Sequence, residues 1–171
     1  SRGVSVWEYI REVYASSLRS KTPMRLYMNM INGGLHARGG LPFQEYLVIP
    51  ETETVSEAFD LGRAFYEALR KELFEMYGTE GVRTGDEGGF VPPCKSEQEP
   101  FEIFETVARK ITDKAHFSYG LDAAANAVNK DRKALRDLYK SFKETFKFSY
   151  LEDPYPEDDF GSFAELTLEI G

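Results

Sequence analysis

The chain has 171 residues, about the length of one domain, and its 42% hydrophobic and 29% charged content is that of a globular rather than a disordered protein. The formal net charge of −8 disfavours a phosphate-backbone partner, so we expect no nucleic acid; a cation suits the charge better, although a solvated acidic surface explains it equally. Cys94 has no second cysteine for an internal disulfide, and no apolar run resembles a signal peptide or membrane span, which predicts a cytoplasmic protein.

The first third of the chain predicts one helix and two strands. Residues 3–14 place apolar side chains at three- and four-residue spacing, as in a helix with one buried face, at Val6, Trp7, Ile10, Val13 and Tyr14. Residues 25–34 form an apolar run ended by two glycines, and residues 42–50 form another bounded by prolines, so both predict strands. Because the pattern starts at Ser1 without a methionine, we expect a fragment or a processed product.

The rest of the chain predicts three more helices and two more strands. Thr54 and Glu57 have the spacing of a capping box, and a helical stripe then runs to Gly78 through Phe59, Gly62, Phe65, Leu69, Leu73 and Met76. A second stripe after Pro100 comprises Phe101, Phe104, Val107, Ala108 and Ile111, and a third helix runs from about Asp131 to Phe146. Residues 117–125 and 146–156 are short runs that each reach an acid, and both predict strands. This alternation favours an α/β fold with a parallel sheet covered by helices, without an internal repeat or linker.

Asp122 and Glu152 end the last two predicted strands. The C-terminal ends of parallel strands share one rim, so these two carboxylates should lie close together. Like charges this close repel unless a cation or a proton lies between them, and Mg²⁺ prefers oxygen ligands. The alternative is that both acids merely cap the helices that follow or belong to an acidic loop. The turn "GDEGG" raises a related question, because a tight turn does not require a second acid, Glu87, beside Asp86.

Five segments, in this order and at these separations, resemble the enolase family of phosphopyruvate hydratases: "MNMINGGLHA", "QEYLVIP", "GDEGGFVP", "GLDAAA" and "YLEDPYPEDD". The resemblance implies that 1–171 is one partial domain, the N-terminal half of a TIM-like catalytic barrel. Residues 1–23 would form a lead-in helix and 24–171 barrel strands and helices, with the second strand running opposite to the others. The family's N-terminal domain and later strands would be absent.

The resemblance also assigns roles to individual residues. Glu87 matches the acid that assists departure of hydroxide when 2-phosphoglycerate becomes phosphoenolpyruvate, and Glu45 matches its partner. Asp122 and Glu152 match two of three carboxylates that hold Mg²⁺. The third carboxylate and the lysine base belong to later strands of the family.

Two further residues match substrate-binding positions of the family. His36 matches a histidine on a loop that closes over the substrate, and Gln44 matches a neighbouring polar residue.

Two hypotheses therefore stand. The chain is either part of a working enolase or an enolase-like module that serves in binding or assembly without catalysis. The four acids favour the first, whereas Leu35, Arg38 and the segment "NAVNKDRK" depart from the family pattern and favour the second. We expect the isolated chain to be inactive, and to self-associate or form a homo-oligomer because half a barrel leaves strand edges open.

Overall fold

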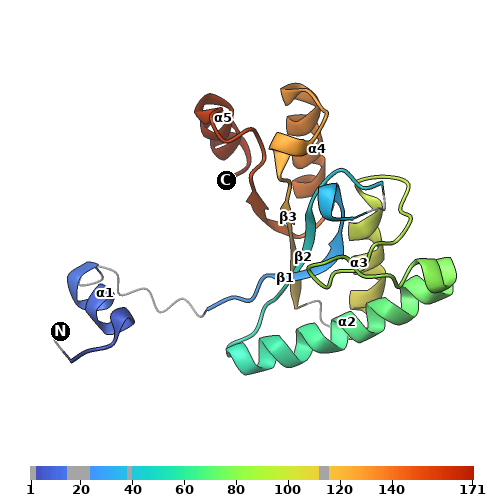
Figure 1. Cartoon of the computed structure of the whole chain (residues 1–171), viewed down its shortest axis with the longest axis horizontal. Helices are drawn as coiled ribbons and strands as arrows, with labels where there is room; N and C mark the ends of the chain where they lie inside the picture. The colour runs from blue at the N-terminus through green and yellow to red at the C-terminus, as the bar shows by residue number, and fades with distance from the viewer. Residues whose placement is uncertain (1–2, 15–23, 38–39, 112–115) are drawn as a thin grey trace.

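The computed structural model describes residues 3–14, 24–37, 40–111 and 116–171 (Figure 1). In chain order the elements are α1 (Val6–Tyr14), β1 (Met28–Asn32), η1 (Gly34–His36), β2 (Glu45–Pro50), α2 (Val55–Tyr77), η2 (Gly78–Glu80), α3 (Glu99–Ile111), β3 (Phe117–Asp122), η3 (Ala125–Ala127), α4 (Arg132–Thr145), β4 (Phe148–Glu152) and α5 (Phe160–Ile170). The α/β class and the predicted strands are confirmed. In this part of the chain, no helix is both long and apolar enough to cross a membrane.

The four strands form one open sheet in the order β1-β2-β3-β4. β2 is antiparallel to both of its neighbours, and only β3 and β4 are parallel. The prediction that the second strand runs opposite to the others is confirmed. The expectation of a parallel sheet from simple alternation is wrong for two of the three strand pairs, β1–β2 and β2–β3. Between β1 and β2 the structure describes only the single turn η1, whereas parallel neighbours are usually joined by a crossover α-helix.

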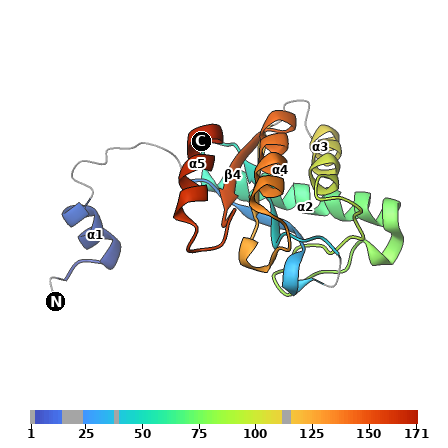
Figure 2. The same ribbon diagram turned by 90° about the horizontal axis from the view of Figure 1, so that it is seen from above.

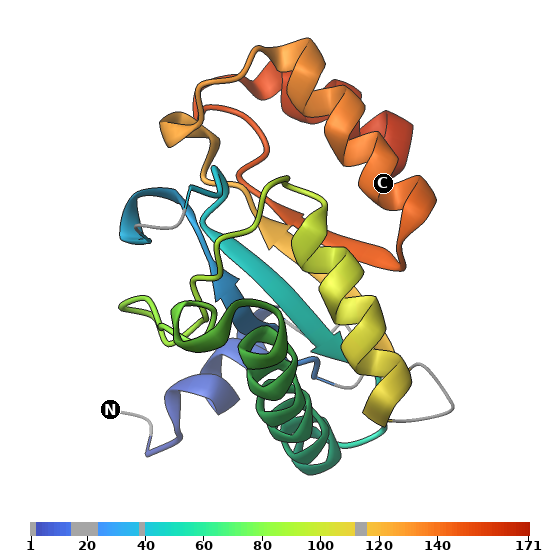
Figure 3. The same cartoon turned by 90° about the vertical axis from the view of Figure 1, so that its right-hand side faces the viewer.

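Helices α2, α3 and α4 pack on one face of the sheet and form the core with it (Figure 3). Tyr46 of β2 contacts Phe101 of α3 with ring centroids 5.3 Å apart, and Phe101 contacts Phe142 of α4 at 5.0 Å. All three residues are fully buried. Each fully buried aromatic of this kind contributes about 1.5–3 kcal/mol through removal from water. The aromatic-rich helices thus fix the sheet from one side.

Helix α2 begins as predicted but buries a slightly different face. The Thr54 side chain accepts a hydrogen bond from the Glu57 N–H and Glu57 returns one to the Thr54 N–H, so the capping box is confirmed. The buried positions are Ala58, Gly62, Phe65, Leu69 and Leu73. Phe59 and Met76, predicted as part of the stripe, are 56% and 47% exposed, because each lies one position away from the row that faces the sheet.

Helix α1 forms where predicted but lies apart from the sheet and its helices (Figures 1 and 2). None of its residues is buried, and Trp7 is 61% exposed, so the prediction of a buried face is wrong for the part of the chain described. The predicted boundary at residue 23 lies outside the described residues.

The C-terminal helix α5 was not predicted. The Asp159 side chain caps it by accepting a hydrogen bond from the Ser162 N–H, and it packs beside α4 (Figure 2). Leu166 is its one buried residue in the structure described, so the stripe that marks a buried helix is weak here.

Candidate functional site

Four polar residues form a continuous row across the sheet. Asn32 of β1 is the Cα partner of Glu45 in β2, Glu45 is the partner of Asp122 in β3, and Asp122 is the partner of Glu152 in β4. Because β2 is reversed, its first residue lies on the same rim as the last residues of the other strands. The prediction that Asp122 and Glu152 meet at the strand ends is confirmed, and Glu45 joins them.

The loop that carries Glu87 is held against the edge of β1. Phe90 pairs with this strand through the hydrogen bonds Asn32 N–H to Phe90 O (2.8 Å) and Phe90 N–H to Met30 O (2.8 Å). The Gly88 N–H donates to Gly85 O at 3.1 Å and closes the turn. Outside the sheet, the Tyr66 ring stacks on Phe90 with centroids 4.5 Å apart. These contacts place Glu87 beside the polar row although it lies in a loop.

Three side-chain amides donate to the Glu87 carboxylate. The Asn32 Nδ2 lies 2.6 Å and the Asn29 Nδ2 3.3 Å from its Oε2, and the Gln44 Nε2 lies 3.3 Å from its Oε1. Gln44 was predicted as a substrate-binding residue, and here its side chain contacts a predicted catalytic acid. Both oxygens of Glu87 therefore have donors on the protein side.

The carboxyl group of Glu45 has a strongly raised pKa. Its pKa is raised to about 7, first because it is partly buried, then because Glu87 and Asp122 lie near and Glu87 shares a hydrogen bond with it, with Glu152 adding to the repulsion. A carboxyl group in such a position is a reasonable proton carrier near neutral pH, since it holds a proton for part of the time.

Asp122 and Glu152 are held by their own local contacts. The Asp122 Oδ1 accepts from the Ala124 N–H at 3.1 Å, and the Glu152 Oε2 accepts from the Tyr150 hydroxyl at 2.9 Å. Burial raises the pKa of Asp122, the Ala124 N–H opposes this, and Glu152 and other nearby acids raise it further. The two carboxylates thus repel each other, as the sequence predicted for a pair without a cation between them.

A metal ion would have two oxygen-donor residues here, Asp122 and Glu152, which suits Mg²⁺ chemically. Within the described ranges, no three Asp, Glu, His or Cys side chains are grouped closely enough to hold a metal ion. The pair would therefore need water or further groups to complete the coordination.

Two predicted features near the site stay untested. The backbone of His36 lies in η1, but its side chain is outside the described residues, as is the whole of Arg38. Leu35 is 84% exposed on the same short helix.

The sequence analysis missed Asn29 and Asn32. The available signal was the presence of two amides within an apolar strand, since buried polar side chains usually have hydrogen-bonding partners.

A helix-covered sheet that gathers acids at one rim is the arrangement of the β/α-barrel enzymes, whose active sites lie at strand ends. Residues 21–171 match the family model described as "Enolase, C-terminal TIM barrel domain". The chain is 36% identical over 155 residues to the enolase of Methanocaldococcus jannaschii, covering 84% of this chain and 37% of that protein. It is 30% identical over 191 residues to the enolase of Solanum lycopersicum, covering 99% and 43%. A third relative, the enolase of Pyrococcus furiosus, is 34% identical over 161 residues, covering 84% and 37%.

The chain belongs to the enolase family. It spans about two fifths of the length of the curated relatives it matches.

Proposed function

We propose that this chain provides the first half of the active site of an enolase, which interconverts 2-phosphoglycerate and phosphoenolpyruvate as part of glycolysis. The observation that carries the proposal is the row of Glu45, Asp122 and Glu152 across adjacent strands, with Glu87 beside it. A scaffold without catalytic function has no need for four acids at one rim, because their mutual repulsion disfavours folding.

The proposed cofactor is Mg²⁺, with Asp122 and Glu152 as its ligands from this chain. When bound, the ion would neutralise negative charge that develops on the substrate carboxylate during proton removal. The proposal gains support from the donor set, which consists of hard oxygen atoms, and from the raised pKa of Asp122, which a cation would reverse.

The chain's own residues would manage the proton at the leaving hydroxyl. Glu87 would face that hydroxyl, because its carboxylate is fixed by amides on its protein side. Glu45, with a pKa near neutrality, would supply and recover the proton through its hydrogen bond with Glu87. His36 and Gln44 would complete the substrate side of the site. The lysine base and a third metal ligand would come from outside these residues, so we expect the chain alone to be inactive.

The proposal extends to partners and location. We propose a cytoplasmic protein without a nucleic-acid partner, since the net charge of −8 repels phosphate backbones. Its association with further copies is argued below from the open edge of the sheet.

The test is a chimera that joins this chain to the N-terminal domain and the C-terminal half-barrel of an intact enolase. Phosphoenolpyruvate formation would be followed by its ultraviolet absorbance in the presence of Mg²⁺. We expect turnover in the chimera, its loss on Glu87→Gln, and weaker Mg²⁺ binding by calorimetry on Asp122→Asn and on Glu152→Gln.

The alternative is an enolase-like module that binds or assembles without catalysis. The exposed Leu35, next to His36 in η1, is the observation that favours it. A chimera that is correctly folded and binds substrate but shows no turnover would support this alternative over the enzyme.

A further inference from the structure

We propose that Asn29 and Asn32 are positioning residues that, together with Gln44, hold the Glu87 carboxylate in a single orientation. We call these three residues the amide clamp. The inference deepens the proposed function, because it rests on Glu87 having the role of the acid at the leaving hydroxyl.

A register shift in β1 is what brings the two asparagines together. Asn29 pairs with Leu47 and Asn32 pairs with Glu45, so three steps along β1 correspond to only two along β2, and Met30 is the additional residue. In a regular strand, side chains three residues apart point to opposite faces. The bulge at Met30 therefore turns Asn29 to the face that carries Asn32, and bulges of this kind are frequent beside active sites.

Both asparagine amides are oriented with their nitrogen toward Glu87. Their Nδ2 atoms point at Glu87 Oε2, and rotation of either amide by half a turn would bring its oxygen against a carboxylate oxygen instead. Asn29 Oδ1 and Asn32 Oδ1 are both buried, and neither accepts a hydrogen bond from any described residue. A buried acceptor without a partner costs free energy, and here that cost accompanies the hydrogen bonds that both amides donate to Glu87.

The glycines of the Glu87 loop make room for the clamp. A Cβ at Gly89 would lie 2.5 Å from Asn32 Oδ1 and 2.8 Å from Asn29 Oδ1. A Cβ at Gly85 would lie 3.1 Å from Asn32 Oδ1. The loop therefore rests directly on the two asparagine side chains, and this close approach answers why glycines flank the second acid of the turn.

The clamp is anchored at its third member as well. The Asn32 Nδ2 also lies 3.3 Å from the backbone oxygen of Gln44, and the Gln44 N–H donates to the backbone oxygen of Asp122 at 3.1 Å. The donors to Glu87 are thus tied to strands β1 and β2 and to the predicted metal ligand. A rigid support of this kind is what a catalytic carboxylate requires to keep its geometry.

The test exchanges donor and acceptor between Asn32 and Glu87 in the full chain. Asn32→Asp places a carboxylate against Glu87. The backbone N–H groups of Gly85 and Val91 each donate to a carbonyl oxygen of the same loop, and we expect both to exchange hydrogen about tenfold faster in this variant. In the double variant Asn32→Asp with Glu87→Gln, the glutamine amide can donate to the aspartate, and we expect exchange to return towards the wild-type rate. Asn29→Asp should have the smaller effect, because its donor is farther from Glu87.

The matched control is Asn126→Asp. The Asn126 Oδ1 accepts from the Glu157 N–H at 3.3 Å, and aspartate preserves that acceptor, so exchange in the Glu87 loop should not change. Should Asn32→Asp fail to fold, NMR of the ¹⁵N-labelled chain provides the test instead. The side-chain amide signals of Asn29, Asn32 and Gln44 should all shift in the variant Glu87→Gln.

Two results would overturn the proposal: a double variant that exchanges as fast as Asn32→Asp alone, or asparagine signals that do not respond to Glu87→Gln. Neither measurement requires turnover. Hydrogen exchange and the amide signals test the amide clamp, whereas turnover of the chimera tests the proposed function. Either proposal can therefore fail without the other.

Discussion

At Gly89 a single added methyl group would meet two members of the amide clamp. We expect Gly89→Ala to destabilise the chain by about 1–3 kcal/mol, because its Cβ would lie 2.5 Å and 2.8 Å from two buried amide oxygens, which would have to shift. Urea denaturation would measure the change. The control is Gly161→Ala, whose Cβ has its nearest neighbour at 4.0 Å and should be tolerated. Equal stability of the two variants would show that the amide clamp yields easily.

Cys94 permits a prediction about thiol chemistry. Its pKa is raised to about 12, chiefly by burial and next by the nearby Glu99 carboxylate, while a hydrogen bond from Tyr77 opposes the shift. The thiolate is the reactive form, so at pH 8 we expect alkylation by iodoacetamide to be far slower than for a free cysteine. Urea at a denaturing concentration should restore the ordinary rate. Fast alkylation of the native chain would mean that the thiol is more accessible than the structure shows.

At this scale the sequence predicted the acids but not what holds them. Glu45, Glu87, Asp122 and Glu152 were found because each lies in a short motif, and the structure brings all four together. Asn29 and Asn32 lie in one of the same motifs, but their shared contact depends on the extra residue Met30, and pairing register is a property of two strands at once. A periodic count along one strand places them on opposite faces.

Among the elements, helix α1 offers the most direct measurement. Trp7 is the only tryptophan of the chain, is 61% exposed, and has the Arg11 guanidinium 5.8 Å from its ring centroid. We therefore expect fluorescence emission typical of an indole in water, with efficient quenching by acrylamide. The change Trp7→Phe should leave the stability of the chain almost unaltered, because the side chain is not in the core. Blue-shifted emission that resists quenching would indicate that α1 packs against another surface.

The helices also show which part of the fold periodicity can predict. The capping box fixed the start of α2, because its hydrogen bonds are local. The apolar stripe did not fix what is buried: Phe59 is exposed on α2, and α1 has no buried residue although its spacing is regular. Burial depends on which surface a helix meets, and that information lies in the tertiary structure. The same limit hid α5, which has one buried residue among those described.

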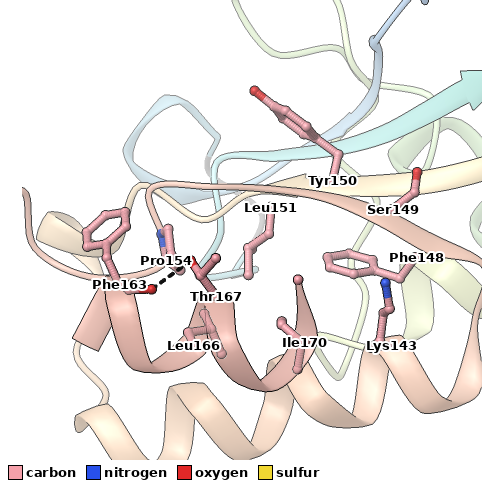
Figure 4. A pocket seen from close by; sticks show the side chains of 11 residues that line it. Lys143, Phe148, Ser149, Tyr150, Leu151, Pro154, Phe163, Leu166, Thr167 and Ile170 are labelled. Carbon is pink, nitrogen blue, oxygen red and sulfur yellow. Dashed lines mark hydrogen bonds between the residues drawn. The ribbon is translucent and has the colours of Figure 1, made fainter. Parts of the chain in front are cut away.

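For the whole molecule, the open sheet is the dominant feature. β4 is the last strand in the order β1-β2-β3-β4, and among the residues described it pairs only with β3. Beside it lies a cavity of about 280 Å³ between β4 and the helices α4 and α5 (Figure 4). Its lining is mixed, with the apolar side chains of Phe148, Leu151, Phe163, Leu166 and Ile170 beside polar ones. The free edge of a strand, with apolar side chains beside it, is the kind of surface at which chains associate.

We therefore expect the isolated chain to self-associate through this edge, and sedimentation velocity over a range of concentrations would detect it. Ile170→Glu should reduce association, because it places a charge in the lining of the cavity. Leu168→Glu is the matched control: it lies on the same helix and is 89% exposed, but it is not part of the cavity lining. If association is reduced by Leu168→Glu and not by Ile170→Glu, the contact lies on the outer side of α5. A monomer that is stable at all concentrations would contradict this prediction, because it would show that the free edge of β4 does not mediate association.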